Sequence, residues 1–268
     1  MIRLVATDLD GTLWDRTCEV RPRVRAAIVE LQHRGVIVLA ATGRRPRSAR
    51  TALEANRLDL PVVCLDGTFG EEFSAGTRFH EALFDGRIAH EVLASFERFD
   101  VAPNVFVDHP HIDVLLATAP THRDEGAESL LQWAMVAPLR QTIPEHRVAA
   151  FTVIGGAHDQ LAPIAHAIRD ARLARATLTA DSLYGGTSLS VIPHEASKWA
   201  GVAAFAARLG IAANEILGVG DAANDLELLA GAGRSVAVRT AAPEVRAVAD
   251  DLIDPPGDDG WAAIVDLV

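Results

Sequence analysis

The sequence predicts an α/β protein: a doubly wound parallel sheet interrupted by an inserted α+β domain. At both ends of the chain, short and continuously apolar segments alternate with helical patterns, which is typical of a parallel sheet covered on both faces. Between about residues 83 and 192 the rhythm changes to closely spaced short strands, some in hairpins. Four apolar segments outside this region end in polar residues, and ligands of open parallel sheets bind at such strand ends.

The N-terminal region is expected to alternate strands and helices. Proline near the start and glycine just past the end mark the first helix, residues 22–34. The continuously apolar residues 36–41 and 61–65 read as buried parallel strands. The expected elements are a strand running into Asp8, helix 22–34, strand 36–41, helix 46–56, strand 61–65 and a small hairpin over 69–80.

The middle of the chain is expected to form a separate α+β domain. Residues 86–99 are amphipathic and predict a helix, and residues 104–107 and 112–117 predict short strands joined by a turn. The remaining expected elements are a helix over 125–135, strand 148–154, helix 158–172 and strands 176–180 and 189–192.

The last part of the chain again alternates apolar strand segments with helical patterns. The expected elements are helix 197–209, strand 216–220, helix 222–229, strand 235–238 and helices 243–250 and 261–267. We therefore expect a core domain formed by residues 1–82 and 193–268, and an inserted domain formed by residues 83–192.

The composition excludes several classes of protein. The 268 residues are 49% hydrophobic and 23% charged, as in ordinary globular proteins. A formal net charge of −11 argues against a nucleic-acid partner, which needs a basic surface. Two cysteines, Cys18 and Cys64, are too few for a disulfide framework. No signal peptide or membrane-spanning segment is visible, so we expect a soluble cytoplasmic protein.

Two aspartates follow the first strand. Residues i and i+2 of an extended chain point to the same side, so the carboxylates of Asp8 and Asp10 can face one spot. Gly11 then permits a tight turn. A cation between the two carboxylates would relieve their repulsion, and Mg²⁺ prefers such oxygen ligands. Taken alone, the pair fits an acidic turn equally well.

Other strand ends supply further candidates. Asp221 is placed to complete a metal site with the first pair, and Thr42-Gly43 offers a hydroxyl and backbone N–H groups to an anion. Asn224 could orient a phosphate. Asp225 could hold a neighbouring cation, although an acidic helix start explains it as well.

Several charged residues and histidines have a plainer interpretation. Arg44 and Arg45 are expected to be solvated charges, and Asp66 is either a substrate contact or a turn residue. A group of histidines and a glutamate matches no closed zinc pattern, and we interpret its members as surface residues. These are His109, His111, His122 and Glu125.

One basic residue differs from all the others. Of 25 basic side chains, only Lys198 is a lysine. A chain that uses arginine wherever a positive charge suffices has kept one compact ammonium, which indicates a specific need at this position.

Four motifs in order resemble the haloacid dehalogenase superfamily of phosphotransferases, most closely its Cof-type branch with a large α/β cap (subclass IIB-like). They are DLDGTL at 8–13, ATGR at 41–44, Ser197-Lys198 at a helix start, and GDAAND at 220–225. The resemblance implies a Rossmann-like core with the inserted domain as its cap, and a phosphatase acting on a small phosphorylated metabolite.

The resemblance also implies roles for the matching residues. Asp8 would be the nucleophile that accepts the phosphoryl group, and Asp10 would be the acid and base. Mg²⁺ would be held by Asp8, the backbone carbonyl of Asp10, and Asp221. Thr42 and Lys198 would bind the phosphoryl oxygens.

Three positions depart from the family pattern and bear on the substrate contacts. Asp66 and Arg239 stand where the branch often has asparagine, and Ser190 stands where it often has glutamate.

A phosphomutase using the same aspartyl-phosphate is the alternative function. A receiver-like signalling module is disfavoured, because receivers are far shorter and lack an insertion. The substrate and the oligomeric state are left open.

Overall fold

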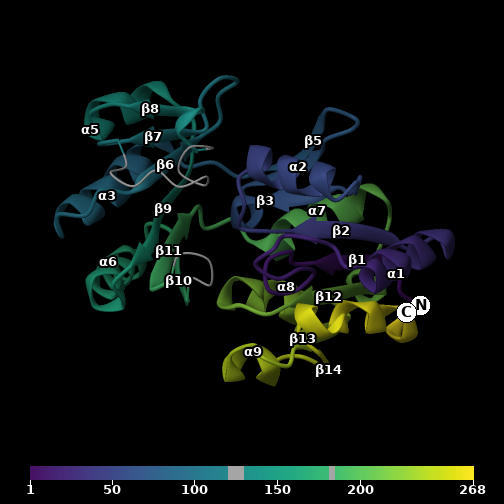
Figure 1. The fold of residues 1–268 in the computed structure, drawn as a ribbon. Helices are drawn as coiled ribbons and strands as arrows, with labels where there is room; N and C mark the ends of the chain where they lie inside the picture. Colours follow the sequence, from purple (N-terminus) through teal and green to yellow (C-terminus); the bar gives the residue numbers. More distant parts are fainter. Residues whose placement is uncertain (120–129, 181–184) are drawn as a thin grey trace. The chain divides into compact units, whose positions relative to one another are not determined.

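The protein forms two compact units, described in a computed structural model for residues 1–119, 130–180 and 185–268 (Figure 1). The first unit joins the two ends of the chain, Met1–Glu81 and Ser197–Val268, and the second is the insertion Ala82–Ala196. Within the described ranges, no helix combines the length and the apolar character needed to cross a membrane.

The first unit is built on an eight-stranded sheet. From β14 to β3 all neighbouring strands are parallel, and β4 and β5 add antiparallel strands at one edge. The spatial order is β14 (Asp251–Ile253), β13 (Arg234–Val238), β12 (Ile216–Gly220), β1 (Leu4–Thr7), β2 (Ile37–Ala41), β3 (Val62–Cys64), β4 (Phe69–Glu72) and β5 (Thr77–Glu81).

Helices cover both faces of this sheet. Leu4 and Ala6 of β1 pack with Val202 of α7 in one buried cluster. Thr7 points to the opposite face of the sheet, where its hydroxyl accepts a hydrogen bond of 2.9 Å from the buried Trp261 indole. The predicted fold class is therefore confirmed. The helices are α1 (Pro22–His33), α2 (Pro46–Ala55), α7 (Lys198–Arg208), α8 (Leu226–Gly231), α9 (Pro243–Ala247) and the 3₁₀ helix Gly260–Leu267.

The second unit has a mixed six-stranded sheet and its own core. All described pairs are antiparallel except β7 with β8. Phe96 of α3, Phe151 of β9 and Ile164 of α6 are buried in one cluster. The strands, in spatial order, are β10 (Arg175–Ala180), β11 (Thr187–Ile192), β9 (Val148–Gly156), β6 (Asn104–Val107), β7 (Val114–Leu116) and β8 (Ala134–Val136), and the helices are α3 (Gly86–Glu97), α5 (Leu139–Thr142) and α6 (His158–Asp170).

A few expected elements differ from the structure. The helix expected over 125–135 lies partly outside the described residues, and its end is wrong because residues 134–136 form β8 beside β7. An apolar run this short fits either a helix or a strand. The helix expected over 243–250 ends at Ala247, and β14 follows unpredicted. The last helix is 3₁₀ rather than α.

Candidate active site

The polar strand ends gather at one edge of the sheet in the first unit. The register pairs Thr7 of β1 with Val219 of β12 and with Ala40 of β2, so these parallel strands end side by side. Asp8, Thr42 and Asp221 follow directly after them. The parallel sheet thus brings residues from both ends of the chain to one place, where such sheets bind ligands.

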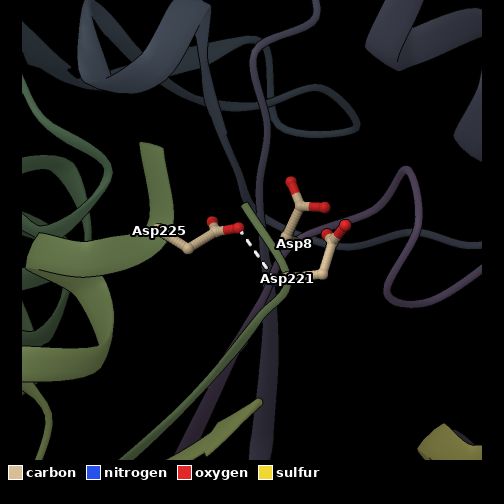
Figure 2. A group of neighbouring side chains, drawn as sticks. All are labelled: Asp8, Asp221 and Asp225. Carbon is tan, nitrogen blue, oxygen red and sulfur yellow. Dashed lines mark hydrogen bonds between the residues drawn. The ribbon is translucent and has the colours of Figure 1, made fainter. Parts of the chain in front are cut away.

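Three carboxylates form the centre of this edge (Figure 2). One oxygen each from Asp8, Asp221 and Asp225 lies within 4.8 Å of the others, and Asp8 and Asp225 are buried. Gly11 makes room for them: a Cβ at this residue would lie 2.6 Å from Oδ2 of Asp221, and its φ of +90° favours glycine.

Lys198 is the ammonium within this cluster. It is the first residue of α7, and the side chain of Ser197 caps the helix by accepting from the amide of Ala200. The Lys198 Nζ donates to Asp8 Oδ1 at 2.6 Å and to Asp225 Oδ1 at 2.7 Å, and the side chain is 1% exposed. Burial alone would lower the pKa of Lys198, but the surrounding carboxylates, Asp225 first, raise it. The ammonium is therefore charged.

Asp225 holds the cluster in shape. Its Oδ1 accepts from Lys198, while its Oδ2 accepts from the backbone amides of Asp221 and Ala222 at 3.1 and 3.0 Å. A Cβ at Gly220 would lie 2.5 Å from the Asp225 side chain. Because both Asp225 oxygens are bound by donors, the carboxylates of Asp8 and Asp221 are better placed to bind a cation.

The cluster carries more negative charge than Lys198 neutralises. Burial, followed by the nearby carboxylates, raises the pKa of Asp8 well above its usual value, despite the opposing effect of Lys198. Burial and Asp225 raise the pKa of Asp221 to about 6, against a hydrogen bond from Thr12 at 2.7 Å. Excess negative charge on close oxygens is the environment that a divalent cation stabilises, so these residues fit a metal site.

The loop after β2 borders the cluster. Thr42 is buried, and its Oγ1 accepts from the amide of Arg44 at 3.1 Å. The Thr42 hydroxyl therefore keeps its own proton for donation. The backbone oxygens of Thr42 and Arg44 accept from the amides of Asp66 and Leu65, which ties the loops after β2 and β3 together.

Asp10 is paired with Arg44, and Arg45 is buried, so the expectation that both arginines are solvated charges is wrong. Nε and Nη2 of Arg44 donate to the two Asp10 oxygens at 2.6 and 2.5 Å, and the Trp14 indole donates at 2.9 Å. Although burial opposes the shift, Arg44 lowers the pKa of Asp10. Asp10 must leave this pairing before it can carry a proton for donation.

Asp66 and Asn224 are joined across two loops. Asp66 is buried, and its Oδ1 accepts from Asn224 Nδ2 at 2.8 Å. Asp66 has left-handed backbone angles, φ 52° and ψ 29°, as expected for a turn residue. Asp66 is therefore a turn residue, as one of the two interpretations expected, and its side chain contacts Asn224; a contact with substrate stays a prediction.

The other candidate residues belong to the second unit, pair with a different partner or lie outside the described residues. Ser190 lies on β11 of the second unit, and Arg239 pairs with Asp254 at 3.0 Å. His109 and His111 are exposed, as expected for surface residues. His122 and Glu125 lie outside the described residues.

Sequence reasoning missed the contacts of Thr12, Trp14 and Arg44 around the aspartates. Thr12 and Trp14 follow the first strand within a few residues of Asp10, but neither side chain titrates or binds metals readily. Only the folded structure shows that they orient carboxylates.

Comparison with known proteins identifies the family. The family of haloacid dehalogenase-like hydrolases matches residues 5–265, nearly the whole chain. The chain belongs to this family. The predicted resemblance and the predicted enzyme class, a phosphatase-type hydrolase, are thereby confirmed.

Individual relatives align with this chain over most of their length. The HMP-PP phosphatase of Serratia proteamaculans is 28% identical over 264 residues, which covers 94% of this chain and 89% of the relative. A haloacid dehalogenase-like hydrolase of B. subtilis has the same fold, with a TM-score of 0.82, 20% identity and 99% of both chains covered. The subclass IIB sugar phosphatase BT4131 gives a TM-score of 0.75 at 17% identity, over 99% of this chain and 98% of that one.

Proposed function

We propose that this protein is a Mg²⁺-dependent phosphatase that hydrolyses a small phosphorylated metabolite through an aspartyl-phosphate. One observation carries the proposal: Asp8 ends a strand with Oδ1 held by Lys198, beside Asp221. A carboxylate held by an ammonium next to a candidate cation site is suited to attack a phosphorus atom whose oxygens need neutralisation.

In the first step, Asp8 attacks the phosphorus and the bond to the leaving oxygen breaks. Asp10, which has first left its pairing with Arg44 and taken a proton from solvent, gives that proton to the leaving oxygen, which departs as an alcohol. In the second step, Asp10 takes a proton from water, the water oxygen attacks the phosphorus, and the bond to Asp8 breaks. Phosphate is released, and both aspartates return to their starting states.

The phosphoryl oxygens need donors during both steps. We assign these to the Thr42 hydroxyl, the backbone amide of Gly43, the Lys198 ammonium and the Asn224 side chain. Catalysis of phosphoryl transfer depends chiefly on positioning and on neutralising charge at these oxygens. Asp225 holds Lys198 and the loop after β12 in place for this purpose.

Mg²⁺ would be held by carboxylate oxygens of Asp8 and Asp221 and by the backbone carbonyl of Asp10. When bound, it supplies positive charge at the phosphoryl oxygens and offsets the repulsion among the aspartates. We assign Asp225 a supporting role, because Lys198 and two backbone amides already donate to its oxygens.

The substrate is proposed from the chemistry and from the relatives. HMP-PP and sugar phosphatases are small-molecule phosphatases by name, so we infer a small phosphate ester as the substrate here. We propose that residues 83–192 form a cap domain that selects the leaving group, and that residues 1–82 and 193–268 form the catalytic core. A cytoplasmic location stays a prediction.

The test is phosphate release from a broad panel of phosphate esters with Mg²⁺ and with chelator, for the parent protein and the Asp8→Asn variant. The expected result is Mg²⁺-dependent release by the parent and none by the variant. Release that persists in excess chelator would overturn the metal requirement. Rearranged ester without free phosphate would indicate the phosphomutase.

A further inference from the structure

Asp66 lies in a backbone segment of unusual conformation. Leu65, Asp66 and Gly67 have successive positive φ angles of 46°, 52° and 105°. A left-handed conformation is costly for residues with a Cβ and persists where the surroundings impose it. Two backbone hydrogen bonds to the loop after β2 hold this segment, and a Cβ at Gly67 would lie 1.9 Å from the Ser197 carbonyl oxygen.

This conformation places the Asp66 carboxylate between three elements of the proposed site. Its Oδ1 accepts from Asn224 Nδ2 at 2.8 Å, and a Cβ at Gly43 would lie 3.1 Å from the same oxygen. Its charge also acts on the Lys198 ammonium, after those of Asp225 and Asp8. The Nδ2 atom of Asn224 is therefore held beside the loop to which we assign phosphoryl binding.

The Asn224 amide has two ends with opposite hydrogen-bonding character. A carboxylate only accepts, so Asp66 can pair with the Nδ2 end of Asn224 and would repel the Oδ1 end. The Asn224 Oδ1 is buried without a hydrogen-bond partner among the described residues. The orientation thus leaves one buried oxygen unpaired, which indicates that Asp66 dictates the orientation.

We propose that Asp66 is a positioning residue that holds the donor end of Asn224 toward the phosphoryl site. The Nδ2 atom carries two hydrogens, of which Asp66 takes one and the phosphoryl oxygen takes the other. This inference rests on the proposed phosphatase function. Because Asp66 acts through Asn224, a substitution of Asp66 and a substitution of Asn224 must affect the same step of the reaction.

Asp66→Asn is the variant that separates positioning from charge. Asparagine tolerates the left-handed backbone and keeps the side-chain shape, but it can pair with either end of the Asn224 amide. The donor would then turn away in most of the molecules, because the buried Asn224 Oδ1 could accept from the new amide, and kcat would fall about tenfold, with KM within about threefold. A purely electrostatic role predicts the opposite sign, because removing a negative charge beside an anion site favours the anion.

Asp259→Asn is the matched control. Asp259 has nearly the same backbone angles, φ 58° and ψ 24°, and pairs with Arg21 instead of a site residue. The Asp259→Asn variant loses the same charge as Asp66→Asn and should keep kcat and KM within about twofold of the parent. Asp66→Asn should keep the melting temperature of the parent or raise it, since the cluster then carries one negative charge fewer.

A double-mutant cycle with Asn224→Ala completes the kinetic test. Asn224→Ala should lower kcat by roughly tenfold to a hundredfold, and Asp66→Asn should add nothing in that background. A kcat for Asp66→Asn at or above that of the parent, or two effects that multiply independently, would overturn the proposal.

An NMR measurement tests the pairing without turnover. The sequence has four asparagines, Asn56, Asn104, Asn214 and Asn224, so the side-chain amide signals are few. The Asn224 signals are those missing in Asn224→Ala, and they should shift and exchange faster in Asp66→Asn. If no ester is hydrolysed, the phosphatase proposal fails, and these signals still decide the pairing: movement supports it, and unchanged signals overturn it.

Discussion

Replacing Lys198 by methionine removes the only ammonium from the buried carboxylate cluster. Its Nζ lies 2.6 and 2.7 Å from Asp8 and Asp225, and both carboxylates would lose their counter-charge while remaining buried. Removing one partner of a buried ion pair costs about 3–5 kcal/mol. The first unit has about 150 residues, for which each kcal/mol lowers the melting temperature by about 2–4 °C, so we expect a fall of roughly 6–20 °C.

The assay is thermal unfolding in excess chelator at pH 7.5, for Lys198→Met and for the double variant Lys198→Met/Asp225→Asn. The second substitution removes one of the unpaired charges and should recover part of the loss. A melting temperature for Lys198→Met within about 2 °C of the parent would refute the inference that the ammonium neutralises the cluster.

Lys198→Arg tests the geometry rather than the charge. The wide guanidinium fork does not fit where a compact ammonium is 1% exposed and bonded to two carboxylates. We expect kcat to fall by roughly tenfold to a thousandfold at saturating Mg²⁺. A kcat within about twofold of the parent would show that Lys198 does not contact the phosphoryl group.

Three further predictions follow from the carboxylates and the insertion. Asp8→Asn should abolish phosphate release while the protein stays folded by circular dichroism, because an amide cannot form the acyl phosphate; substantial turnover by a pure sample would contradict this. The pKa of Asp221 is about 6 in the folded protein, against 3.8 for a free aspartate, so the stability that this group contributes falls as pH rises from about 4 to 6. In excess chelator, the parent protein should lose stability over this range relative to Asp221→Asn. The stabilisation by Mg²⁺ should be larger at pH 7.5 than at pH 5. Exchanging residues 83–192 for the insertion of a relative should change which esters are hydrolysed, and an unchanged profile would place specificity in the core.

The strand ends of the first unit were predictable because continuous apolar runs and the polar residues after them are local signals. Asp8, Thr42 and Asp221 were found in this way, and parallel pairing brings them together. Lys198 was found because its residue type is unique in the chain. In each case, a short stretch of sequence contained the information.

The contacts that were missed depend on residues distant in sequence or on backbone conformation. Arg44 was judged from the abundance of arginine, yet it pairs with Asp10, 34 residues away. The pairing of Asp66 with Asn224 spans 158 residues, and the Asp66-Gly67 turn signal does not show which side chain this left-handed segment will contact. The strand β14 contains three residues and only two apolar ones, too few to show a period.

The separation of the catalytic groups along the chain has a consequence for biosynthesis. Asp8 and Lys198 are 190 residues apart, so a ribosome adding roughly 5–20 residues per second needs about 10–40 s to make the second after the first. Until then β1 lacks its neighbour β12 and has an unpaired edge, which invites association between nascent chains. The inserted unit, with its own core, can fold during this interval. Chaperone binding should therefore be strongest before β12 emerges from the ribosome.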